Sequence, residues 1–225
     1  MIIYESKEVV AIATLKTSNR KTGNMIQIWL LHPEINPVEL VKSGLDALTI
    51  CKGCPFASGR GCYVNVGQAP NAVFKAYKRG SYKYLYPKDY DTVFSGRTVR
   101  FGAYGNPSLL PISIIKAIAS ASDGWTGYFH DWREMSDEKR IAYSEYFMAS
   151  TETESSRKLA ESLGMRYFHV SPTKPKNAIE CLSTAKGISC ADCKLCSGLS
   201  KKRIASVWID PHGSKKSKAI AQASA

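Results

Sequence analysis

The stretch TVRFGAYGNPSLLPISIIKAIASASDGWTGYFH, residues 98–130, decides the fold. Its first part, 98–105, predicts a strand followed by a loop, and the next part, 108–121, predicts a helix. A second strand is expected at 125–130. A strand, a helix and another strand in this order favour two parallel strands that are covered by the helix.

The same alternation extends in both directions from this stretch. About five repeats predict an α/β fold, either an open sheet or a partial (open) parallel α/β barrel with a C-terminal cysteine-rich segment. The other expected strands are 7–15, 25–31, 146–150, 165–171 and 202–210, and the other expected helices are 69–79, 136–146 and 151–164. A short helix is expected after Asn36, with Pro37 in its first turn and Gly44 at its end.

The chain is expected to have three parts. Residues 1–175 would form the partial barrel and carry a first cysteine loop at 51–62. Residues 176–212 would form a cysteine-rich, metal-binding segment, and 213–225 a flexible basic tail.

Positive charge predominates in this chain, with 31 Lys and Arg against 19 acidic residues and a formal net charge of +12. Such an excess favours a polyanionic partner, most simply nucleic acid or a nucleotide, although a basic surface that only aids solubility is the plain alternative. One basic run is interleaved with tyrosines, a combination that suits phosphates and stacked bases. Its candidate nucleic-acid residues are Lys75, Lys78, Arg79 and Lys83.

The sequence shows no apolar run long enough to span a membrane, and its first residues do not read as a signal peptide. We therefore expect a cytoplasmic protein without a membrane partner. Seven cysteines, an odd number, argue against a disulfide framework in that compartment.

The cysteines fall into two groups, which is not expected of incidental buried thiols. The second group can close a metal site of its own, and its spacing C-x8-C-x2-C-x2-C favours an iron–sulfur cluster over zinc. The first group, spaced C-x2-C-x7-C, is one ligand short. Its fourth ligand could come from a distance, or Cys181 could join it. The first group is Cys51, Cys54 and Cys62, and the second is Cys181, Cys190, Cys193 and Cys196.

Loops after successive parallel strands are expected to meet at one rim of the sheet. The loops GAYGNP (102–107), HDWR (130–133), STETE (150–154) and SPTKP (171–175) are candidates for the lining of one pocket. Ordinary turn and cap chemistry is the alternative for each loop. His130 could act as an acid or base in the pocket, and it and Arg133 are the candidate catalytic residues.

A three-cysteine loop before a helix, and a glycine-containing loop after the next strand, resemble the radical S-adenosylmethionine enzymes. The resemblance implies that Cys51, Cys54 and Cys62 hold a [4Fe–4S] cluster whose open iron binds S-adenosylmethionine. It also implies a methionine-binding loop at 102–106, with Gly102, Tyr104, Gly105 and Asn106 as its residues. The usual cysteine spacing of that superfamily is C-x3-C-x2-C.

Over most of its length, the chain also resembles a group of phage-encoded, cysteine-rich proteins, to which we assign no activity. The shared stretches are CKGCP, GCYVN, RFGAYGNP, TGYFHDWR and CADCKLCSG. That resemblance implies the cytoplasm of the host cell as the location.

Two hypotheses for the function follow. The first is a small radical S-adenosylmethionine enzyme with iron–sulfur clusters that acts on a nucleotide or a nucleic-acid-linked substrate. The second is a non-catalytic nucleic-acid-binding or redox-sensing protein whose cysteine sites hold structural zinc or iron–sulfur. The sequence contains no P-loop, HExxH or Ser-His-Asp pattern that favours a kinase or hydrolase.

Overall fold

A computed structural model describes residues 1–199 and 205–223 of the chain. Its first sheet has five strands in the order β1-β2-β3-β4-β5. Strands β1, β2 and β3 pair antiparallel, whereas β3, β4 and β5 pair in parallel. The strands are β1 (Ile2–Glu5), β2 (Val10–Thr14), β3 (Ile26–Leu31), β4 (Thr98–Tyr104) and β5 (Gly124–Thr126).

The second sheet is parallel throughout and has the order β6-β7-β8-β10-β9. Its strands are β6 (Tyr128–Phe129), β7 (Met148–Thr151), β8 (Tyr167–Val170), β9 (Ala178–Glu180) and β10 (Ser206–Ile209). Neither sheet closes on itself within the described residues. The expected open α/β fold is therefore confirmed, whereas the antiparallel pairing of β1, β2 and β3 departs from the parallel sheet that was expected.

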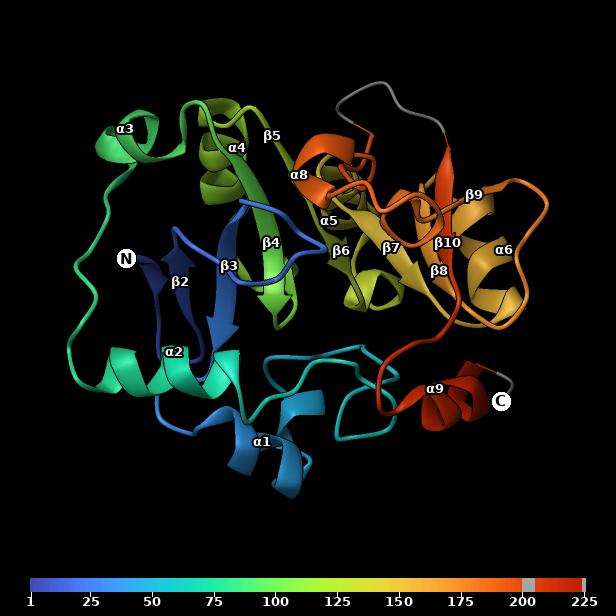
Figure 1. Ribbon diagram of the computed structural model, residues 1–225, viewed down its shortest axis with the longest axis horizontal. Coiled ribbons are helices and arrows are strands. Elements are labelled where there is room, and N and C mark those ends of the chain that lie inside the picture. Colours follow the sequence, from blue (N-terminus) through green and yellow to red (C-terminus); the bar gives the residue numbers. More distant parts are fainter. Residues whose placement is uncertain (200–204, 224–225) are drawn as a thin grey trace.

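The two sheets meet at Gly127, which separates β5 from β6 in one run of chain. A Cβ atom at this position would lie 2.6 Å from the ring of Phe147, so the chain passes too close for a side chain. The Gly127 N–H donates to the carbonyl of Cys196 at 2.9 Å. This hydrogen bond joins the junction between the two sheets, β5 and β6 in Figure 1, to the loop of the second cysteine group.

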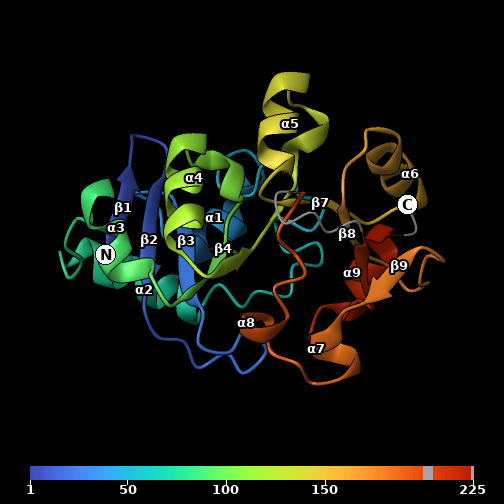
Figure 2. The same cartoon turned by 90° about the horizontal axis from the view of Figure 1, so that it is seen from above.

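Helices connect the parallel strands. Figure 2 shows α4 beside the first sheet and α6 beside the second, where α6 packs on β7 and β8. The helices are α1 (Pro37–Ser43), α2 (Ala69–Lys78), α3 (Tyr90–Phe94), α4 (Ile112–Ala121), α5 (Asp137–Ser144), α6 (Glu154–Ser162), α7 (Leu182–Ala185), α8 (Cys190–Cys193) and α9 (Lys216–Ala223).

The main expected elements are confirmed, most clearly the cap of α1. The Asn36 side chain accepts hydrogen bonds from the N–H groups of Val38 and Glu39, and Gly44 ends the helix with φ +76°. Strands β1 and β9 and helix α3 were not expected. Of the strand expected at 202–210, residues 206–209 form β10, and 202–204 lie outside the described residues.

The cysteine-rich C-terminal segment is not confirmed as a unit of its own. Strands β9 and β10 lie within the range 176–212, yet they belong to the second sheet. Helix α9 lies in the range expected to be a flexible tail. Its Ala219 is buried, and a Cβ at Gly61 would lie 2.8 Å from the Ala219 Cα, so α9 packs against the first cysteine loop.

We predict that Gly105→Ala destabilises the protein strongly. Gly105 has φ +82°, and an added Cβ would lie 2.6 Å from the Leu30 carbonyl oxygen and 2.7 Å from Ile50 Cγ2. Gly80 is the matched control, because it has φ +69° and nothing within 4 Å of the added atom. Gly80→Ala should cost about 1 kcal/mol for the backbone strain, and Gly105→Ala about 1–3 kcal/mol more for the overlap. Equal losses in urea denaturation would contradict this reading.

We also predict a pH dependence of stability that involves His169, whose Nδ1 lies 2.9 Å from Thr151 Oγ1 on the neighbouring strand. Burial, and then the charge of Arg157, lowers the pKa of His169 to about 4. Because the unfolded chain takes up this proton first, the free energy of unfolding should fall as the pH drops from about 6.5 towards 4. His169→Gln should flatten that decline in urea denaturation at several pH values. An unchanged slope would show that His169 does not contribute.

Candidate metal centre

The first cysteine loop is folded around Asp46, which is buried. The Asp46 carboxylate accepts hydrogen bonds from the Ser58 N–H at 2.8 Å and from the Ser58 hydroxyl at 2.7 Å. The Asp46 carbonyl accepts from the Cys51 N–H at 2.7 Å. These contacts close the loop on itself and set the positions of the three thiols.

Polar groups near the sulfur atoms of this loop favour the thiolate forms. The backbone N–H groups of Phe56 and Ala57 act to lower the pKa of Cys54, and that of Val64 acts to lower the pKa of Cys62, although burial outweighs both effects. The Tyr104 hydroxyl, from the end of β4, acts in the same way on the pKa of Cys51, and it is buried with no hydrogen-bond partner among the described residues. Donors of this kind stabilise negative charge on metal-bound thiolates.

Without a metal these thiols are held in the protonated form. Burial is the main cause that raises the pKa values of Cys51, Cys54 and Cys62, and neighbouring thiols contribute to the rise at Cys51 and Cys54. The pKa of Cys54 reaches about 12 in total. A thiolate is the form that binds metals. A bound cation would reverse these shifts, so metal loading of this loop would release protons.

The second cysteine group is built on α8 and the loop after it. The Cys190 N–H donates to the Lys21 carbonyl at 2.9 Å, which joins α8 to the turn before β3. Arg166 of the second sheet donates to the carbonyls of Leu195 at 2.8 Å and Gly198 at 2.6 Å. The loop that carries Cys196 is thereby fixed from two directions.

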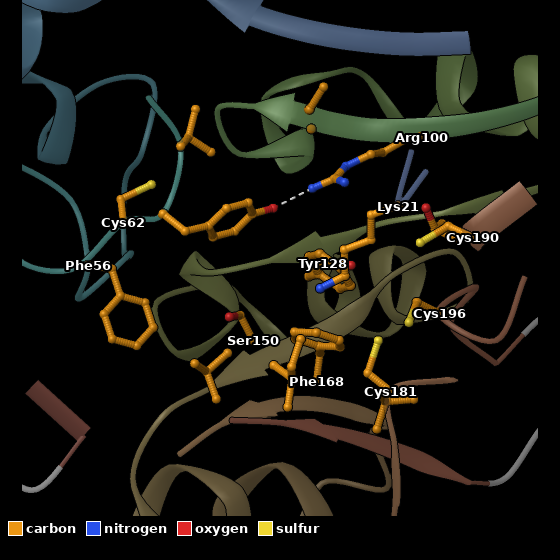
Figure 3. Close-up of a pocket in the computed structure, with 18 of the residues that line it drawn as sticks. Lys21, Phe56, Cys62, Arg100, Tyr128, Ser150, Phe168, Cys181, Cys190 and Cys196 are labelled. Atoms are coloured by element: carbon orange, nitrogen blue, oxygen red, sulfur yellow. Dashed lines mark hydrogen bonds between the residues drawn. The ribbon is translucent and has the colours of Figure 1, made fainter. Parts of the chain in front are cut away.

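Cys181 lies with this second group. Figure 3 shows it on the same side of a cavity as Cys190 and Cys196, opposite Cys62. Burial is the main cause that raises the pKa of Cys196, and the thiols of Cys190, Cys181 and Cys193 contribute to the rise. This arrangement favours the second group for Cys181, and its role as a metal ligand stays a prediction. All seven cysteines are free thiols.

Both groups line one cavity. All seven cysteines contribute to its wall, as do residues 102–106 and His130. In Figure 3, Cys62 and Phe56 lie on one side, and Cys181, Cys190 and Cys196 on the other. Of the loops expected to line one pocket, GAYGNP therefore contributes residues 102–106 and HDWR contributes His130, whereas the second cysteine group in the same wall was not expected.

The described side chains give no group of three or more His, Cys, Asp or Glu residues arranged around a single metal-ion position. Metal binding at either cysteine group therefore stays a prediction. The gathering of the thiols in one wall and the raised pKa values of Cys51, Cys54, Cys62 and Cys196 are the features that fit such a role.

Asn106 attaches the GAYGNP loop to the first cysteine loop and is fully buried. Its backbone N–H donates to the Ile50 carbonyl at 2.8 Å, and its side-chain amide donates to the Lys52 carbonyl at 3.2 Å. Its side-chain oxygen lies 3.4 Å from the His130 N–H. A single side chain therefore links three segments at the end of the sheet.

The two candidate catalytic residues differ in position. His130 lines the cavity, and its buried Nδ1 has no hydrogen-bond partner among the described residues. Burial, and to a smaller extent the charge of Arg133, lowers the pKa of His130 to about 4. It is therefore a neutral imidazole at neutral pH. Arg133 is not part of the lining: it pairs with Glu152 at 2.8 Å and lies over the Trp132 ring at 4.4 Å.

Of the other expected loops, Ser150 lines the cavity and residues 171–175 do not. The candidate nucleic-acid residues Lys75, Lys78, Arg79 and Lys83 lie outside the cavity, on and after the end of α2. Lys78 pairs with Glu34 at 2.9 Å. A nucleic-acid role for this surface stays a prediction.

The sequence analysis did not identify several residues that line the cavity, above all Arg100 in the middle of β4. The feature that could have indicated Arg100 is its charge between the apolar residues Val99 and Phe101, which are buried in the strand. Among the described residues that line the cavity, the charged side chains are Lys21, Arg100 and Lys194, and no carboxylate is present. The cavity is thus positively charged as well as rich in thiols.

Comparisons with protein-family models, curated proteins and solved structures found no match to this chain. Within the part of the chain that the structure describes, no helix has the length and apolar character needed to cross a membrane.

We predict that Asn106→Leu displaces the first cysteine loop, because the buried carbonyl of Lys52 then loses its amide donor. The free energy of unfolding should fall by about 1–3 kcal/mol. Metal bound at the first group should be lost, while metal at the second group is retained. Asn71→Leu on α2 is the control. Elemental analysis together with urea denaturation checks both effects, and an Asn106→Leu protein with normal metal content and stability would contradict the role of Asn106.

Proposed function

We propose that the protein is an iron–sulfur enzyme of radical S-adenosylmethionine type that acts on a nucleotide or a nucleic-acid-linked substrate. The observation that carries the proposal is the shared cavity, in which a group of three cysteines and a group of four face the same space as the 102–106 loop. Three thiols leave one iron of a [4Fe–4S] cluster without a cysteine, and four thiols can close a second cluster.

The residues of the first loop fit a cluster. Cys51, Cys54 and Cys62 would be its ligands, and the N–H groups aimed at Cys54 and Cys62 would stabilise their thiolates. Buried thiols with raised pKa values suit a site that is completed by a cation. The second group, Cys181, Cys190, Cys193 and Cys196, would hold the auxiliary cluster.

The 102–106 loop would bind the methionine part of S-adenosylmethionine. At Gly102, which has φ +73°, an added Cβ would lie 2.8 Å from the Gly105 carbonyl oxygen, so the turn is too tight for a side chain and presents its backbone. Asn106 connects the loop to the chain before Cys54, and the buried Tyr104 hydroxyl, which has no hydrogen-bond partner among the described residues, lines the cavity together with Cys51. The loop is in this way fixed relative to the cluster position.

A cluster held by Cys51, Cys54 and Cys62 would, together with an added one-electron reductant, supply the electron for reductive cleavage of S-adenosylmethionine. The protein's own residues would orient the reactants and exclude water. His130, neutral and buried in the wall, would hold or release a proton next to the reacting groups.

We predict about eight irons and as many sulfides per chain after anaerobic purification, since two [4Fe–4S] clusters are proposed. Cys54→Ser and Cys193→Ser should each retain about four, because each removes a ligand from one group only. With dithionite and S-adenosylmethionine, the wild-type protein should form 5′-deoxyadenosine. Cys54→Ser should form none, whereas the Cys193→Ser protein should keep part of this cleavage.

A colourless protein that contains zinc and forms no 5′-deoxyadenosine would reject this function. It would favour the alternative, a non-catalytic nucleic-acid-binding or redox-sensing protein with structural metal sites. Loss of all iron from both cysteine variants would contradict the division into two separate sites.

A further inference from the structure

Arg100 is a buried cation that the described structure leaves partly unpaired. It lies in β4 between Gln27 and Thr126 of the neighbouring strands, with 8% of its surface exposed. Its Nη2 donates to the Tyr63 hydroxyl at 2.5 Å, the bond drawn as a dashed line in Figure 3. Its Nε has no hydrogen-bond partner among the described residues.

Burial of a guanidinium without a carboxylate is costly, because arginine stays charged and needs both charge compensation and acceptors. The other charged side chains that line the cavity add positive charge instead of compensating the charge of Arg100. Lys21 and Lys194 line the same cavity, and Lys21 Nζ lies 3.4 Å from Nε2 of His212. Three cations and no described carboxylate make this a site for an anion of more than one charge.

Aromatic rings line the cavity beside these cations. The rings of Tyr128 and Phe168 are stacked with their centroids 4.3 Å apart, and those of Tyr63 and His212 are stacked at 5.3 Å. Figure 3 places Arg100, Lys21 and Tyr128 between the two cysteine groups. A planar ring can stack on such surfaces while an attached anion reaches Arg100.

We propose that Arg100 binds the phosphate of a nucleotide substrate in the space between the two cysteine groups. Lys21 and Lys194 supplement its charge, and the aromatic walls receive the base. This inference deepens the proposed function, because it names the substrate class and the residue that binds it. A phosphate is favoured over a carboxylate because its second negative charge matches the surplus of cations.

A competing role for Arg100 is the neutralisation of cluster thiolates, since the thiol of Cys190 lies within its electrostatic range. The two roles differ in what Arg100 controls. A phosphate-binding residue controls nucleotide affinity, whereas a partner of a cluster controls its metal content and reduction potential.

The test is calorimetric titration of the anaerobically purified full chain with AMP, adenosine and inorganic phosphate. Wild-type protein should bind AMP at least tenfold more tightly than adenosine. Arg100→Met should weaken AMP binding by about ten- to one-hundredfold and leave adenosine binding and metal content unchanged. Arg100→Lys should restore part of the affinity, and Lys116→Met on α4, which removes a cation outside the cavity, should have no effect.

The inference is overturned if wild-type protein binds none of the three probes, or binds AMP and adenosine equally. It is also overturned if Arg100→Met keeps its AMP affinity but changes the reduction potential or metal content. If Arg100→Met fails to fold, the inference is still tested by the ratio of the AMP and adenosine affinities of the wild-type protein and by the AMP affinity of Arg100→Lys. A zinc protein that binds AMP through Arg100 would retain this inference while rejecting the proposed function.

Discussion

The constraint on which the rest of the structure depends is the gathering of seven thiols around one cavity. Loss of hydration raises the pKa of Cys51, Cys54, Cys62, Cys190 and Cys196, so these five groups stay protonated without a compensating cation. Backbone N–H groups nevertheless act to lower the pKa of two of the thiols in the first loop. Such an arrangement is favourable only when a cation turns the thiols into thiolates, and this is the physical basis of the proposed clusters.

The fold brings the two groups together through parallel strands and a single glycine. Parallel pairing places the segments that follow β3, β4 and β6 at one edge of the sheets, where the first cysteine loop, the 102–106 loop and His130 meet. Gly127 lets the chain pass from one sheet to the other and binds the carbonyl of Cys196. The second group thereby faces the first across the cavity instead of lying apart.

The sequence predicted the features that depend on local patterns. Runs of buried apolar residues marked β3 and β4, and Asn36, Pro37 and Gly44 marked the ends of α1. The spacing of the cysteines separated a group of three from a group of four. It did not predict that both would face one cavity, because that depends on pairing between strands far apart in the chain.

Other features lay beyond local patterns for similar reasons. Strands β1 and β9 are short and lie at the edges of their sheets, so they carry little apolar periodicity. Helix α9 has four polar residues among its eight, two of them lysines, and no marked apolar repeat in the sequence. Its position depends on the close approach of Ala219 to Gly61. Arg100 could have been noticed as a charge inside an apolar strand, but its relation to Tyr63 required the tertiary structure.

The central claim is that the first group holds a cluster with one iron open to a small molecule. Electron paramagnetic resonance of the reduced protein, recorded before and after addition of S-adenosylmethionine, tests it most directly. The account predicts a cluster signal whose shape and g-values change on addition, because the open iron gains a ligand. An absent signal, or a signal that the addition leaves unchanged, would contradict it.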